Sequence, residues 1–179
     1  MSNEKQIVDN REFSIMINRL SHQLIENHLD FTETVLVGLQ PRGVDFARKI
    51  LNNLVEISGN NNIVLGSLDI SFFRDDFGRR ETIISPDKLD MNFSIENKRV
   101  VLIDDVLFTG RSIRAALDAL TSFGRPKEVE LMVLIDRRLK RHLPIQPDYV
   151  GKSVDSISSE RVIVKWGNDG HNKIILLKK

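Results

Sequence analysis

The segment 99–112, with the sequence RVVLIDDVLFTGRS, constrains the fold more than any other part of the chain. An apolar run ends at Asp104 and Asp105, and a Thr-Gly-Arg-Ser turn follows a short apolar spacer. Carboxylates accept hydrogen bonds from the hydroxyls of a sugar diol, and a glycine-bearing turn at a helix N-terminus binds phosphate. The segment therefore predicts a strand-loop-helix unit that binds a phosphorylated ribose.

Apolar runs and amphipathic segments alternate along the rest of the chain. Helical spacing is found at 9–28, 44–55 and 112–123, the last with Ile113, Ala116, Leu117 and Leu120 on its inner face. Strands are expected at 34–39, 63–73, 100–103 and 128–135, with a hairpin-like excursion through 75–84 and shorter strands at 149–150, 162–166 and 174–177. The alternation predicts an α/β fold, with a mostly parallel twisted sheet and helices on both faces.

Composition limits the class of protein. The chain has 179 residues, 41% of them hydrophobic and 28% charged, and no linker-like stretch divides it, so one domain over 1–179 is expected. It has no cysteine, which excludes disulfides, and its 4 histidines lack metal-site spacing. No apolar signal core or membrane-spanning run is present, so we expect a cytoplasmic protein without a membrane partner. The formal net charge of +1 gives no overall attraction to nucleic acid.

Open parallel sheets bind ligands beyond the carboxyl ends of their strands, so the loops at those ends are expected to form one cleft. Asp104 and Asp105 would accept hydrogen bonds from ribose, and the turn after them would donate to a phosphate. The candidate ligand-binding residues are Pro41, Arg42, Gly43, Asp104, Asp105, Val106, Leu107, Phe108, Thr109, Gly110, Arg111 and Ser112. Alone, the acid pair is compatible with a polar loop and the turn with a plain helix cap; their combination favours a site.

The segment resembles the phosphoribosyl-pyrophosphate motif of type I phosphoribosyltransferases. The stretches 69–76 (DISFFRDD), 101–115, 124–126 and 143–152 (LPIQPDYVGK) are similar to the bacterial pyrimidine operon attenuation proteins, which also act as uracil phosphoribosyltransferases. The likeness runs from about Ile7 to Lys165. It implies the type I phosphoribosyltransferase fold with a flexible β-hairpin and a small hood, and a homodimer or higher homo-oligomer.

The resemblance implies a reaction in which uracil and phosphoribosyl pyrophosphate (PRPP) give UMP and pyrophosphate, with Mg²⁺ bound to PRPP and no metal ion held by the protein alone. Asp104 and Asp105 would hold the ribose, and Arg74 would lie on a lid that closes over the pyrophosphate. Phe108 stands where purine-specific relatives carry an acidic residue, which predicts little general-base catalysis. The base would bind near Arg137 and Val162, although Arg137 is equally compatible with a surface cation.

The resemblance also implies nucleotide-dependent binding of an mRNA leader. The candidate RNA-binding residues are Arg19, His22, Arg138, Lys140 and Arg141, which are also compatible with a solvated charged surface. The chain departs from the regulators at Asn18, Pro41 and 138–142. Three alternatives therefore stay open: an attenuator with vestigial catalysis, a phosphoribosyltransferase for another nucleobase, and a receiver-type Mg²⁺ site, which leaves the glycine turn without a role.

Overall fold

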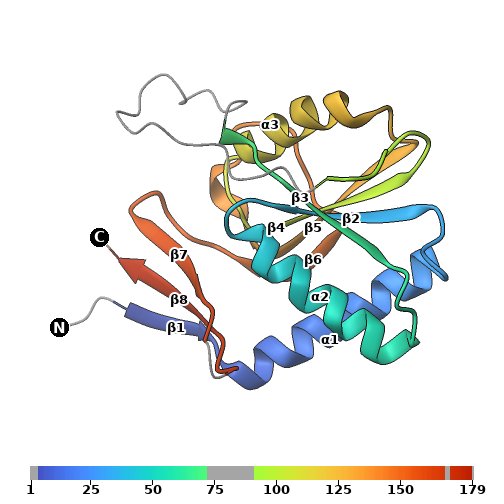
Figure 1. Cartoon of the computed structure of the whole chain (residues 1–179). Helices are drawn as coiled ribbons and strands as arrows, with labels where there is room; N and C mark the ends of the chain where they lie inside the picture. The colour runs from blue at the N-terminus through green and yellow to red at the C-terminus, as the bar shows by residue number, and fades with distance from the viewer. Residues whose placement is uncertain (1–3, 72–90, 168–169, 179) are drawn as a thin grey trace.

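The computed structural model describes residues 4–71, 91–167 and 170–178 (Figure 1). Its main layer is a five-stranded parallel sheet in the order β3-β2-β4-β5-β6. The strands are β2 (Thr34–Leu39), β3 (Val64–Leu68), β4 (Arg99–Leu107), β5 (Glu128–Arg137) and β6 (Tyr149–Val154). The expected α/β fold, with a mostly parallel sheet, is confirmed.

Helices cover both faces of this sheet (Figure 1). The helices are α1 (Asn10–His28), α2 (Gly43–Ser58) and α3 (Arg111–Leu120), which continues into the 3₁₀ turn η3 (Thr121–Phe123). One buried cluster joins α1 and α2 to side chains such as Val101 and Ile103. A second cluster joins α3 to Val100 and Leu102, on the opposite face of the same strand. Successive β4 residues therefore point into different cores, as alternation along a strand requires.

A smaller antiparallel sheet in the order β1-β8-β7 lies beside the main one (Figure 1). Its strands are β1 (Glu4–Val8), β7 (Glu160–Lys165) and β8 (Lys173–Lys178). Strand β1 was not predicted from the sequence. Helix α1 begins directly after it with a capping box, in which Asp9 Oδ1 accepts from Glu12 N at 2.8 Å and Asp9 N donates to Glu12 Oε2 at 3.3 Å.

Several details of the predicted elements were wrong. Strand β4 ends at Leu107 and β6 at Val154, each four residues beyond the predicted end, so the acid pair lies within β4 rather than after it. Strand β3 ends at Leu68, because Asp69 Oδ1 accepts from Ser71 N at 2.8 Å and closes a local turn there. Leu117, expected inside, is 41% exposed. Strand β5 continues through Arg137, two residues beyond the predicted end. The predicted hairpin at 75–84 lies outside the described residues. Within the part of the chain that the structure describes, no helix has the length and apolar character needed to span a membrane.

Candidate active site

The acid pair lies near the carboxyl end of β4, the central strand of the sheet. Asp105 N donates to Asp104 Oδ1 at 2.9 Å, so the first carboxylate is anchored by the backbone of the second residue. Asp105 is only 6% exposed, and among the described residues its Oδ2 has no hydrogen-bond partner. A buried acceptor without a donor is costly and indicates a group built to meet a ligand.

The environment of Asp105 favours its neutral form relative to an exposed carboxyl. Burial raises the pKa of Asp105, while attraction to Arg42 and hydrogen bonds, one of them from the backbone of Val106, partly oppose the rise. A bound cation or a set of hydroxyl donors would stabilise the ionised form. The carboxylate is therefore suited to a ligand that brings positive charge or donors with it.

The loop between β2 and α2 approaches the acid pair closely. A Cβ at Gly43 would collide with Ile103 O and lie 3.0 Å from Asp104 Cα. Glycine at this position lets the N-terminus of α2 lie against β4. The Gln40–Pro41 peptide bond is cis, and Gln40 N donates to Leu68 O at 3.0 Å. Pro41 and Arg42 are exposed, beside the point where Gly43 meets the acid pair.

The turn after the acid pair is held from two sides. Gly110 has φ +90°, a left-handed conformation that favours glycine, and α3 begins at the next residue. The carbonyl of Thr109 accepts from His142 N at 3.0 Å and from Leu143 N at 3.2 Å. Arg141 donates to Phe108 O at 2.8 Å and also pairs with Asp136. The segment after η4 (Arg138–Lys140) therefore supports the turn, a contact that sequence reasoning missed.

Arg137 joins the turn to the small sheet. Its guanidinium lies 3.8 Å from the Phe108 ring centroid, a cation–π contact. The same side chain donates to Ser156 Oγ at 2.7 Å and to Glu160 O at 2.9 Å. Arg137 is 5% exposed, and burial lowers its pKa. The structure thus places Arg137 between Phe108 and the start of β7.

Val162, the second candidate base-binding residue, lies inside β7, and its side chain is buried in the core. Strand β7 pairs with β8 and is an edge strand of its sheet. Only the backbone of Val162 is therefore placed to contact a ligand. Arg74, the candidate lid residue, lies outside the described residues.

The candidate RNA-binding residues lie on both sides of the edge strand β6. Arg19 donates to Val150 O at 2.9 Å and to Gly151 O at 2.7 Å, while His22 is exposed further along α1. Arg138 forms two 3.0 Å hydrogen bonds with Asp155, directly after β6, and Lys140 is exposed. Arg141, by contrast, is turned to the Phe108 carbonyl.

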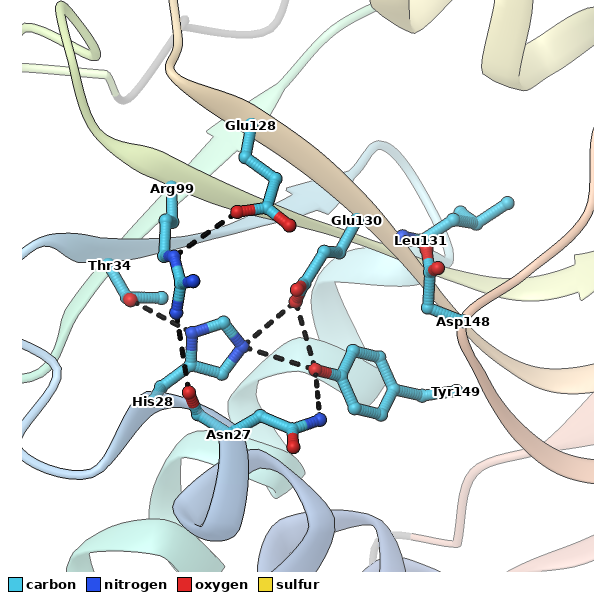
Figure 2. Close-up of polar contacts among 9 residues, drawn as sticks. All are labelled: Asn27, His28, Thr34, Arg99, Glu128, Glu130, Leu131, Asp148 and Tyr149. Atoms are coloured by element: carbon cyan, nitrogen blue, oxygen red, sulfur yellow. Dashed lines mark hydrogen bonds and ion pairs between the residues drawn. The ribbon is translucent and has the colours of Figure 1, made fainter.

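A buried polar network lies at the amino ends of the parallel strands, at the other end of the sheet from the acid pair (Figure 2). His28 Nε2 lies 2.9 Å from Glu130 Oε2, and Thr34 Oγ1 lies 3.0 Å from His28 Nδ1. Tyr149 donates to Glu130 at 2.9 Å and accepts from Asn27 at the same distance. Neutral His28, protonated on Nε2, satisfies every contact in this set. The network joins α1 to β2, β5 and β6, whereas the candidate site lies at the carboxyl ends of the strands.

Comparison with known proteins places this geometry in a family. The phosphoribosyl transferase domain family matches residues 3–167. The bifunctional protein PyrR of Actinobacillus pleuropneumoniae serotype 5b is 42% identical over 176 residues, covering 98% of this chain and 97% of that protein. The chain belongs to the PyrR family of phosphoribosyltransferase-domain proteins. PyrR of Chloroflexus aurantiacus is also 42% identical, over 99% of this chain and 97% of its own length.

Solved structures confirm the fold. The hypoxanthine phosphoribosyltransferase of Trypanosoma cruzi superposes with a TM-score of 0.71 at 16% identity, covering 97% of this chain and 96% of that one. A hypoxanthine-guanine-xanthine phosphoribosyltransferase gives a TM-score of 0.69 at 18% identity and covers 98% of this chain and 94% of its own. The type I phosphoribosyltransferase fold implied by the resemblance is thus confirmed.

Proposed function

We propose that the chain is a uracil phosphoribosyltransferase that converts uracil and PRPP to UMP and pyrophosphate. The observation that carries the proposal is the cradle formed by Asp104, Asp105 and the Gly110 turn, in a member of the PyrR family. In this reaction N1 of uracil bonds to the anomeric carbon as the bond from that carbon to pyrophosphate breaks. The N1 proton is released, and positive charge develops on the ribose ring.

The acid pair and the turn hold the sugar phosphate in this scheme. Asp104 and Asp105 accept from the ribose hydroxyls, and their negative charge stabilises the cationic ring. The backbone amides from Val106 to Ser112, with the N-terminus of α3, hold the 5′-phosphate. Arg42 and the amides beside it neutralise charge on the departing pyrophosphate. Catalysis in this site rests on positioning and charge stabilisation.

The donor set also fits Mg²⁺ bound together with PRPP. Asp104 and Asp105 offer only oxygen, which a hard cation prefers, and the buried Asp105 Oδ2 has no partner among the described residues. These two carboxylates would help to hold the ion beside the ribose. When bound, Mg²⁺ supplies charge neutralisation on the pyrophosphate oxygens.

Recognition of the base rests on the Phe108–Arg137 contact and the free edge of β7. Phe108 has no group that takes a proton, which agrees with a base that needs no strong protein catalyst. Arg137 fixes the segment from Ser156 to Glu160, and Val162 offers backbone groups two residues later. Arg74 remains our candidate for a lid over the pyrophosphate.

A turnover assay with PRPP and Mg²⁺ against uracil, orotate, hypoxanthine and guanine tests the proposal. We expect UMP formation with uracil and at least a hundredfold loss of kcat/KM in the double variant Asp104→Asn, Asp105→Asn. Asp118→Asn is the matched control, because Asp118 lies on the exposed side of α3, where it pairs with Arg114 at 3.6 Å. Product with a purine alone would overturn the choice of base.

A second function, nucleotide-dependent RNA binding, is proposed on a separate observation. Arg19 and Arg138 flank the edge strand β6. The Arg19 guanidinium donates to Gly151 O within the strand, and the Arg138 guanidinium donates to Asp155, the residue after it. This arrangement presents cations along one edge of the molecule, as contact with RNA phosphates requires. We expect Arg138→Gln to weaken binding of a pyrimidine-operon leader RNA in the presence of UMP and to reduce its salt dependence. Equal binding by Arg138→Gln and wild type at every salt concentration would contradict this role.

A further inference from the structure

A cavity of about 260 Å³ lies between α1 and α2, and Asn172, directly before β8, closes one side. It is lined by Phe13, Ser14, Ile17, Lys49, Asn52, Asn53, Glu56 and Asn172. None of the residues assigned above to the sugar, the phosphate, the base or RNA lines it. Whatever it binds is therefore separate from the candidate active site.

The lining of the cavity includes a hydrogen-bond donor that the protein leaves unused. Among the described residues, Asn53 Nδ2 is buried and has no hydrogen-bond acceptor. The same holds for Nε1 of Trp166, a residue that packs edge-to-face on Phe13 with ring centroids 5.6 Å apart. Trp166 is not among the lining residues, but Asn53 is. Buried donors without acceptors are uncommon in native proteins, so the Asn53 amide in the lining indicates a ligand that brings an acceptor.

Lys49 adds a positive charge to this donor set. Its Nζ lies 5.8 Å from the centre of the Trp166 ring, and within the described part of the chain it forms no ion pair. Glu56 lies seven residues further along α2, about 10 Å away along the helix axis. The end of the cavity near Lys49 therefore favours an anion, while the acidic side chain lies at the other end.

The wall formed by Asn172 is already fixed. Asn172 N donates to Asn10 Oδ1 at 2.8 Å, its Nδ2 donates to Gly170 O at 3.1 Å, and its Oδ1 accepts from Gly167 N at 3.3 Å. Phe13 and Ile17 give the cavity an apolar side. A ligand would meet a preformed surface, which reduces the entropy lost on binding.

We propose that this cavity is a second binding site, for a small planar carboxylate. Its carboxylate accepts from Lys49 and Asn53, and its flat apolar body packs on Phe13 and Ile17. The site joins both helices of one face to the small sheet, whose strand β7 borders the candidate active site.

Trp166 makes the test direct, because it is the only tryptophan in the chain. Sodium benzoate is titrated into the ¹⁵N-labelled full-length chain at constant ionic strength, and the single indole Nε1–H resonance is followed. We expect a saturable shift in the wild type. Lys49→Gln should weaken binding at least tenfold, and Asn53→Asp, which places a carboxylate against the ligand, should abolish it.

Arg48→Gln is the matched control. Arg48 precedes Lys49 on α2 and does not line the cavity, and its guanidinium lies 4.0 Å from Asp45. Its replacement by Gln removes one positive charge, as Lys49→Gln does. The control should bind benzoate as the wild type does, and PRPP turnover in all three variants shows that they fold. The proposal would be overturned by a resonance shift that grows linearly with benzoate without saturating, or by displacement of benzoate by UMP. An equal loss of benzoate affinity in Lys49→Gln and Arg48→Gln would also overturn it.

Discussion

Replacement of Gly43 by alanine tests how closely the β2–α2 loop must approach the acid pair. The added Cβ would collide with Ile103 O and lie 3.0 Å from Asp104 Cα and 3.3 Å from Asp104 Oδ1. The two nearest atoms belong to the backbone of β4, which cannot yield as the Asp104 side chain can. The N-terminus of α2, and Arg42 with it, must move away from Asp104.

Two effects follow from this displacement. Overpacking of this kind costs about 1–3 kcal/mol of unfolding free energy. A misplacement of about 1 Å in a catalytic constellation costs up to about 10²-fold in rate. We therefore expect kcat/KM for PRPP to fall by about 10- to 100-fold in Gly43→Ala, measured by steady-state kinetics at saturating uracil.

Gly59→Ala separates the two effects. Gly59 ends α2 with φ +69° and has no heavy atom within 4 Å of an added Cβ. Alanine there costs about 1–2 kcal/mol of backbone strain without contact with the site. We expect a similar loss of stability with unchanged kinetics. If Gly43→Ala keeps wild-type kcat/KM for PRPP, the loop does not contribute to the site and the reasoning is refuted.

Three further predictions concern the buried network and the base pocket. Tyr149→Phe removes a hydroxyl that bonds Glu130 and Asn27, so urea unfolding should show a loss of about 1–3 kcal/mol with unchanged turnover; unaltered stability would contradict the network. Burial lowers the pKa of His28 below its ordinary 6.5, so the unfolded chain binds more protons in acid and stability should fall as pH drops below about 6.5. His28→Gln should make the unfolding free energy depend less on pH in this range. A stronger pH dependence in this variant would contradict a lowered pKa of His28. Phe108→Leu removes the ring under Arg137, and we expect it to raise the KM for uracil more than the KM for PRPP. A change in the KM for PRPP alone would place Phe108 outside the base pocket.

The strand-turn-helix segment was predicted well because its signals are local. An apolar run, two acids and a turn glycine follow one another in the chain, and β4 and α3 lie where that order places them. One part of the fold depended on a distant partner instead. Strand β1 has little apolar pattern and forms because it pairs with β8, at the other end of the chain.

The contacts of several candidate functional residues were hidden for the same reason. Arg19 meets its carbonyl partners on Val150 and Gly151 only after the chain has folded, and Arg141 reaches back to Phe108 in the same way. A run of basic residues in a sequence does not show which cations face solvent and which are turned inward. The burial of Asp105 was equally invisible, because it depends on the packing of neighbouring elements rather than on its neighbours in sequence.

Calorimetric titration of the full-length chain with PRPP in the presence of Mg²⁺ tests the central claim most directly. We predict saturable binding with one site per chain in the wild type, and its loss in the double variant Asp104→Asn, Asp105→Asn with an unchanged thermal midpoint. No heat of binding with the wild type, or equal binding by the double variant, would contradict a sugar-phosphate cradle built from the acid pair and the Gly110 turn.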